Sequence, residues 1–413
     1  MMNEYITKPE ILAPAGDEEA LSAALRFGAD AVYVGAQQFG MRTSPKNFDE
    51  ESLPRAVRSA HELGKKLYLT CNILPRETQL PQLPDFLAFA QQCSVDALII
   101  ADLGVFELAK KYAPNVPRHV STQAGIVNSE TAKAFYNMGA DRVVLARELS
   151  FGEISAIRAN IPKELEIECF VQGAMCVSFS GRCLISEYLT GRDPNRGDCS
   201  QPCRWKYHLF EENREGNFYP VMEDNGGTFL YNSKDMCMID YIPELVKAGI
   251  SSFKIEGRAK TAYYSAVTTN AYRQAVDAYF SGGLREDFKT PELIKEELEK
   301  ISHREYSTGF YLGTTPGQTT SNGGYIRHYD LVALCEQECD FGGIITQRNK
   351  FYLGDIVDVL PPGGIPFTVT AQKLVNENGE EVDSTPHPME RLELHCEKKI
   401  PAGSFLRVRK KTE

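Results

Sequence analysis

The sequence predicts an α/β protein: a TIM-type (β/α)8 barrel, regular or distorted, followed by a small C-terminal antiparallel β-barrel domain. Short apolar segments alternate with amphipathic segments over about 250 residues, which is the length of such a barrel. A short motif that begins with glycine recurs between these segments. From residue 329 on, closely spaced apolar runs are separated by Pro-Gly and Asn-Gly turns, a pattern typical of antiparallel strands.

The barrel prediction depends on eight strand candidates between Ile11 and Ile255. Each candidate except the seventh precedes a segment with helical periodicity, such as residues 18–27 and 261–281. Gly-Ala-Asp opens the second and sixth candidates, because a left-handed glycine cap ends the helix before each strand. The candidates lie within residues 11–16, 28–35, 66–74, 97–103, 118–123, 139–145, 166–171 and 249–255.

Three parts follow from this pattern. Residues 1–283 form the barrel, with a cysteine-rich loop at about 172–237 inserted after the seventh strand. Residues 284–328 are expected to be a linker or arm, since they open with an acidic, lysine-rich stretch. Residues 329–413 form the small β-barrel domain, whose basic end, residues 407–411, is expected to be either an RNA contact or a solvated terminus.

Composition narrows the function classes. A chain of 413 residues with 42% hydrophobic content can bury a large core, and no apolar run reaches the length of a membrane-spanning helix. The net charge of −11 disfavours a nucleic-acid partner without excluding one, because binding depends on local patches. The start of the chain lacks a signal-peptide pattern, so we expect a cytoplasmic protein with reduced thiols.

The cysteine-rich loop is the strongest chemical signal. Cys176, Cys183 and Cys199 have Gly, Ser, Arg, Asp and Pro neighbours rather than an apolar run. Thiols in such a loop indicate an iron–sulfur or metal site. The alternative is burial in the core, which suits Cys71 and Cys93 better.

Polar residues follow the predicted strands, where barrel enzymes build their sites. Arg42, Arg147 and Arg258 would together suit a ligand with several carboxylates, because guanidinium binds carboxylate at two points. Glu256 and Asp102 are candidates for proton transfer. A surface salt bridge or a helix cap is the alternative role for each. The full set at the predicted mouth is Arg42, Asn72, Asp102, Gln123, Arg147, Glu148, Glu256 and Arg258.

Several motifs resemble the collagenase-like peptidase family U32, and together they span essentially the whole chain. They are LAPAG (12–16), VQGAMCVSFSGRCL (171–184), TGRDPNRG (190–197), NSKDMC (232–237), KIEGR (254–258) and HREYSTGF (303–310). Within that family the likeness is greatest to bacterial proteins of prephenate-dependent tRNA hydroxylation. The resemblance implies an iron–sulfur-dependent enzyme that hydroxylates the wobble uridine of tRNA to 5-hydroxyuridine.

The resemblance also implies ligands and partners. Four cysteines would hold a [4Fe-4S] cluster: Cys176, Cys183, Cys199 and Cys237. Cys203 is an additional thiol that could replace Cys199, and Cys169 is a weaker candidate. The expected partners are tRNA, prephenate or a similar anionic metabolite, and a redox partner or second subunit, with no membrane. Trp205 and Tyr207 could stack on an unpaired base or pack in the core.

Two other function classes remain open. The family label favours a peptidase, but the sequence has no His-Glu-x-x-His, and His61, His119 and His208 offer no evident Cys–His pair. A noncatalytic scaffold that delivers a cluster or RNA to another enzyme is the third class. Iron and sulfide analysis of the anaerobically purified protein separates the redox and peptidase hypotheses.

Overall fold

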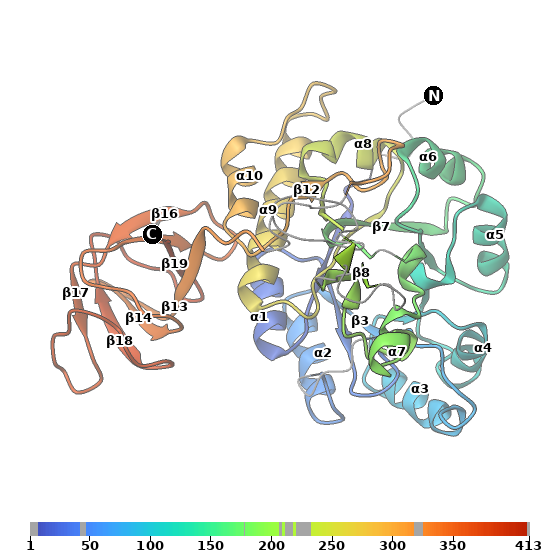
Figure 1. Cartoon of the computed structure of the whole chain (residues 1–413), viewed down its shortest axis with the longest axis horizontal. Coiled ribbons are helices and arrows are strands. Elements are labelled where there is room, and N and C mark those ends of the chain that lie inside the picture. Colours follow the sequence, from blue (N-terminus) through green and yellow to red (C-terminus); the bar gives the residue numbers. More distant parts are fainter. Residues whose placement is uncertain are drawn as a thin grey trace.

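The structure is a computed structural model that describes residues 7–41, 47–176, 178–205, 209–210, 218–219, 233–317 and 325–410. A ring of helices surrounds a barrel, and a separate β-sheet domain lies beside helices α1, α9 and α10 (Figure 1).

The barrel consists of eight parallel strands and is closed by pairing between β7 and β11. The predicted TIM-type fold is therefore confirmed. Most strand residues are buried, as expected when helices cover a parallel sheet. The strands are β1 (Glu10–Pro14), β2 (Ala31–Gly35), β3 (Lys66–Cys71), β4 (Ala97–Ile100), β5 (Arg118–Val120), β6 (Arg142–Val144), β7 (Glu166–Ala174) and β11 (Ser252–Ile255).

The surrounding helices begin at side-chain caps that the sequence supplies. Asp17, Asn128 and Thr261 each accept a hydrogen bond from the first turn, and Ser150 forms a capping box with Glu153. The helices are α1 (Glu18–Arg26), α2 (Ser52–Glu62), α3 (Leu83–Gln92), α4 (Leu103–Tyr112), α5 (Ser129–Asn137), α6 (Phe151–Ala159), α8 (Ile242–Lys247) and α9 (Ala262–Ser281).

The long excursion after β7 is the main departure from a regular barrel. It contains α7 (Ile185–Thr190) and the short strands β8 (Leu209–Phe210) and β9 (Phe218–Tyr219). The chain returns as β10 (Asp235–Cys237), which pairs antiparallel with the end of β7. Helix α8 then supplies the seventh helix of the barrel.

Residues 284–328, expected as a linker or arm, contain helix α10 (Glu292–Glu299) and strand β12 (Tyr306–Ser307). Strand β12 pairs with β10, and Ile294, Leu298 and Ile301 are buried in the same core cluster as the barrel. This part of the chain therefore packs on the barrel.

The C-terminal domain is an antiparallel sheet of seven strands. An antiparallel β-domain was predicted for this part of the chain. Its pairing order ends at β16 and β17, and no pairing in the described part joins these two strands, so the sheet is a half-barrel. Its strands are β13 (Tyr329–Cys339), β14 (Gly342–Gln347), β15 (Ile356–Leu360), β16 (Phe367–Thr370), β17 (Lys373–Val375), β18 (Arg391–His395) and β19 (Phe405–Arg409).

The start of the basic tail is not solvated, which corrects that expectation for Arg407. The Arg407 side chain is fully buried on β19, where it binds Glu297 of α10 at 2.6 Å and Asp358 of β15 at 3.2 Å. It also donates to the hydroxyl of Tyr263 at 3.1 Å. Arg407 therefore connects the C-terminal domain to the barrel, because a buried guanidinium requires charged partners. None of the helices in the described part is long and apolar enough to cross a membrane.

Candidate active site

A cavity of about 190 Å³ lies at the carboxyl ends of the barrel strands. Its floor is made by strand residues such as Tyr33, Ile99 and Phe170. Its roof comes from the cysteine-rich loop, so the excursion after β7 covers the barrel mouth. This is the position at which barrel enzymes place their chemistry.

Strand β11 and the residues directly after it supply three charged side chains to this cavity. Lys254, Glu256 and the more distal Arg258 line it, and they are only 5%, 7% and 7% exposed. Successive side chains of a strand point to opposite faces, so residues two apart share one face. Glu256 and Arg258 were predicted as site residues. Lys254 was missed, although the same two-residue spacing in KIEGR could have identified it.

Two glycines make room for Glu256 and Arg258. A Cβ at Gly35 would lie 2.4 Å from Nη1 of Arg258, and one at Gly173 would lie 2.4 Å from the Glu256 carbonyl oxygen. Gly173 also has φ of 110°, which side-chain-bearing residues rarely adopt. The Arg258 Nη1 donates to Oγ1 of Thr70 at 2.6 Å, which fixes the guanidinium at the cavity wall.

Below the cavity, Lys254 is held by a buried ion network. Its Nζ lies 2.6 Å from Glu168, which is fully buried, and Glu168 also binds Arg142 at 3.1 Å. Arg142 in turn binds Glu10 at 2.7 Å. Burial lowers the pKa of Lys254, and Glu168 acts in the opposite direction. The network therefore positions a partly desolvated amine at the cavity floor.

Two buried donors at the cavity lack a hydrogen-bond partner in the described part. They are Nε2 of Gln123 and Nε of Arg147. Nη1 of Arg147 donates to the Ala174 carbonyl at 3.0 Å, and its guanidinium lies 3.9 Å from the Phe170 ring centroid. An unpaired buried donor is costly, so these groups fit a site that receives an acceptor-rich ligand.

The cysteine-rich loop is fastened to the mouth by two residues from the predicted set. Glu148 accepts hydrogen bonds from the backbone N–H and hydroxyl of Ser180, at 2.8 and 2.9 Å. The backbone carbonyl of Gln123 accepts from Nε of Arg182 at 2.7 Å. Glu148 and Gln123 therefore hold the roof over the cavity.

Four cysteines of this roof line the cavity: Cys176, Cys183, Cys199 and Cys203. The sulfur of Cys183 accepts the N–H of Ile185 at 3.3 Å, and that of Cys199 accepts the N–H of Gln201 at 3.4 Å. Burial raises the pKa of the Cys176 thiol, while a backbone N–H at Ser178 and the charge of Arg147 oppose that rise.

Cys237, the fourth cysteine of the predicted set, does not line this cavity. It lies on β10 and lines a separate cavity beside α10 and Tyr306. Burial raises its pKa to about 12. The chain returns along the end of β7 as β10, with Cys237 opposite Gln172. Cys169 is buried on β7 and does not line the cavity either.

The four roof cysteines supply the ligand type that an iron–sulfur cluster requires. In the described part, no three His, Cys, Asp or Glu side chains could hold one ion together. In a four-iron cluster each thiolate binds a different iron atom, so the sulfurs surround a volume rather than a point. Backbone N–H groups donate to the sulfurs of Cys183 and Cys199, and such hydrogen bonds orient thiolate ligands.

The remaining predicted residues have other positions. Asp102 caps α4 by accepting from the N–H of Val105 at 3.1 Å, and it does not line the cavity. Its predicted proton-transfer role is therefore replaced by a structural one. Asn72 donates to Oε1 of Gln123 at 3.1 Å. Trp205 is 43% exposed, whereas Arg42 and Tyr207 lie outside the described residues.

No histidine of the described part lines the cavity. His119 is buried inside the barrel against Tyr68, with ring centroids 4.7 Å apart, and His61 pairs with Asp96 at the surface. A Cys–His nucleophile pair is therefore absent from the cavity as far as the structure describes it.

The family follows from comparison with known proteins. The pattern of peptidase family U32 matches residues 16–321, and that of the family's C-terminal domain matches residues 327–407. The chain belongs to peptidase family U32. The motifs and both domains are thus accounted for by one family.

Relatives within this family have different names. A tRNA hydroxylation protein of Bacillus subtilis is 36% identical, over 97% of this chain and 94% of its own length. One from Escherichia coli is 35% identical, over 92% of each chain. A collagenase of Porphyromonas gingivalis is 30% identical, over 86% of each. Among solved structures, a U32 peptidase covers 60% of this chain and 93% of its own, at 17% identity and a TM-score of 0.40.

Proposed function

We propose that this U32 family member is an iron–sulfur-dependent RNA-modifying enzyme that hydroxylates the wobble uridine of tRNA to 5-hydroxyuridine, with prephenate as the required metabolite. The observation that supports it best is the cavity itself, where four cysteines face Arg147, Lys254, Glu256 and Arg258. The names of the B. subtilis and E. coli relatives support tRNA as the substrate.

The proposed cluster ligands are Cys176, Cys183 and Cys199, with either Cys237, as predicted, or Cys203 of the cavity lining as the fourth. When bound, a [4Fe-4S] cluster supplies electron transfer that side chains cannot provide. The loop places the roof cysteines above the cavity, and Glu148 and Arg182 hold the loop there. The chain therefore offers a closed redox site next to a charged floor.

The floor supplies binding and proton-handling groups. Arg147 and Arg258 would bind the carboxylates of prephenate through charge-assisted hydrogen bonds, and the unpaired amide of Gln123 would donate to an acceptor of the ligand. Glu256 and Lys254 are the titratable groups available for proton transfer. Low exposure of these residues limits the access of water.

Arg147 provides a direct test of the prephenate site. Replacing it with Lys keeps the charge but removes the two-point fork, so we expect prephenate binding to weaken about tenfold. Calorimetric titration of the purified protein measures this. The matched control is Arg55→Lys, an exposed arginine paired with Glu18. Equal affinity in wild type and Arg147→Lys would contradict the assignment.

Loss of the protein tests the reaction. In a deletion strain, mass spectrometry of digested tRNA should find the 5-hydroxyuridine nucleoside missing, and the wild-type gene should restore it. Normal levels in the deletion strain would overturn the proposed function. Cleavage of gelatin by the purified protein, abolished by a roof cysteine variant, would instead support a peptidase.

A further inference from the structure

A second cavity adjoins the candidate active site. It has a volume of about 510 Å³ and lies between the barrel and the C-terminal domain. Glu256 lines both cavities, and Gln201 of the cysteine-rich loop also lines this one. The two cavities are thus separated by no more than one layer of side chains. We call the second cavity the interdomain groove.

Cations surround an aromatic ring in this groove. The ring of Tyr325 is 37% exposed and lies 4.4 Å from Nζ of Lys260 and 5.9 Å from the guanidinium carbon of Arg327. Arg304 lies 5.1 Å from the same ring. Such contacts orient the ring and keep positive charge beside it.

Carboxylates of the described part do not neutralise the charges of Lys260 and Arg327. In the described part neither side chain has a carboxylate within 4.0 Å, and their nearest oxygen partners belong to Ser302. Lys300, by contrast, is paired with Glu297 and Asp358, both at 2.7 Å. In a chain with net charge −11, two uncompensated cations beside an exposed tyrosine form a local site for an anion.

We propose that the interdomain groove binds single-stranded RNA next to the nucleotide that enters the active-site cavity. Tyr325 would stack on a neighbouring base, while Lys260 and Arg327 would bind phosphates on either side. The inference rests on the proposed RNA substrate and names the surface that receives it. It also gives the C-terminal domain a role, because Tyr329 and Leu331 of β13 form one wall of the groove.

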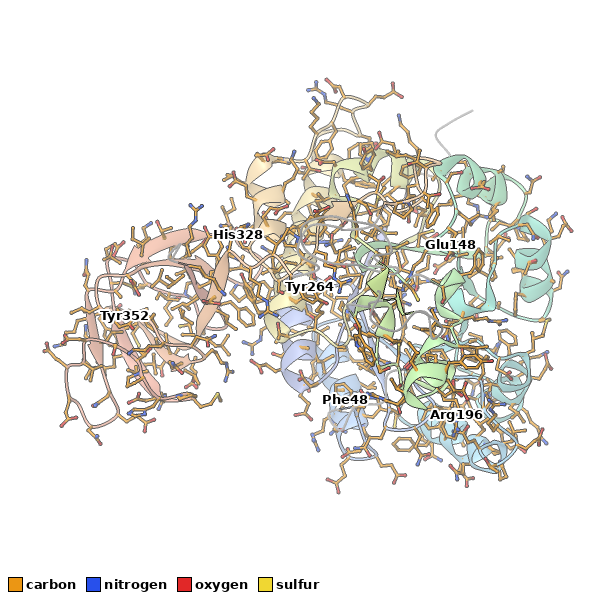
Figure 2. The ribbon with its side chains drawn as sticks, in the orientation of Figure 1. Phe48, Glu148, Arg196, Tyr264, His328 and Tyr352 are labelled. Carbon is orange, nitrogen blue, oxygen red and sulfur yellow. The ribbon has the colours of Figure 1, made fainter. Side chains whose placement is uncertain are left out.

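A second cation–tyrosine pair of the C-terminal domain, which does not line the groove, offers a control. Lys350 lies 4.9 Å from the ring of Tyr352, which is 46% exposed. Figure 2 shows Tyr352 in the sheet domain far from Tyr264, which lines the groove, with His328 between them at the junction. The control pair therefore has the same chemistry on the same domain at a different place.

Binding of a fluorescein-labelled anticodon stem–loop RNA to the full-length protein tests the proposal. Tyr325→Leu should weaken binding about tenfold, and Tyr325→Phe should retain it, because stacking needs the ring. In Lys260→Gln/Arg327→Gln, the slope of log affinity against log salt should become shallower by about 0.7 for each lost phosphate contact. Lys350→Gln/Tyr352→Leu should match wild type in both quantities.

Two results would overturn the groove separately from the function. If wild type binds the RNA and the groove variants bind it equally well with the same salt slope, the groove assignment is wrong and RNA modification stands. If the control variant Lys350→Gln/Tyr352→Leu weakens binding as much as the groove variants do, the RNA lies elsewhere on the sheet domain. If wild type does not bind the RNA and the deletion strain keeps its 5-hydroxyuridine, the proposed function itself fails.

Discussion

At the scale of single residues, the roof cysteines differ in what surrounds them. Cys203 lines the active-site cavity with Cys176, Cys183 and Cys199, whereas Cys237 lies in another cavity. A cluster ligand must share a cavity with the other ligands, because all of them bind one compact group. Cys203 and Cys237 are the two candidates for the fourth ligand, and the cavity lining supports Cys203.

Paired variants test this choice. Cys203→Ala should lose most of the iron and acid-labile sulfide of the anaerobically purified protein, together with its visible absorption. Cys237→Ala should keep all three, because its sulfur does not line the cavity. The reverse pattern would show that the loop rearranges to bring Cys237 to the cluster.

At the scale of elements, the short strand β5 places a titratable ring inside the barrel. His119 is 4% exposed, its Nδ1 has no hydrogen-bond partner in the described part, and burial together with the nearby charge of Arg142 holds its pKa well below the usual 6.5. The folded protein therefore keeps His119 neutral at a pH where the unfolded chain protonates it.

This difference predicts a pH-dependent stability. Below about pH 6.5 the unfolded state binds one more proton at this position, so the free energy of unfolding should fall with falling pH, by up to about 1.4 kcal/mol per pH unit. Denaturant unfolding of wild type and His119→Gln between pH 5 and 7 measures it. The variant should lack this part of the slope, since its side chain does not titrate. Parallel stability curves for the two proteins would exclude the mechanism.

At the scale of the whole molecule, the two domains are joined by apolar and charged contacts. The rings of Phe27 and Phe405 lie 5.6 Å apart, and Asn270 and Gln274 of α9 both donate to the Gly364 carbonyl. Arg407 adds the buried ion pairs with Glu297 and Asp358. Because the interdomain groove lies at this junction, its shape depends on how the domains dock.

Arg407→Leu tests the junction. It leaves two carboxylates buried with only Lys300 as a cation, so we expect a loss of about 3 kcal/mol in the free energy of unfolding. Faster proteolysis between residues 284 and 328 should accompany it. Arg391→Leu is the control, because Arg391 pairs with Glu336 at the surface, where such a pair contributes about 0–1 kcal/mol. Equal stability of the two variants would show that the buried pairs do not hold the domains together.

The sequence by itself determined the barrel, the sheet domain and part of the site, because these depend on local patterns. Alternating and apolar runs specify strands, and the ends of parallel strands meet at one mouth. For this reason Arg147, Glu256 and Arg258 could be placed at the barrel mouth before the fold was known. Lys254 was available from the same two-residue spacing in residues 254–258.

Only the tertiary structure showed which cysteines line the cavity at the barrel mouth, which arginine is buried, and where the two domains form a groove. Cys203 and Cys237 both follow Cys199 in sequence, but the return of the chain along β7 separates them. The sequence predicted Arg407 to be part of a basic tail. In the structure it is buried and forms ion pairs with residues of α10 and β15. Each of these outcomes depends on contacts between residues far apart in the chain, which no local pattern encodes.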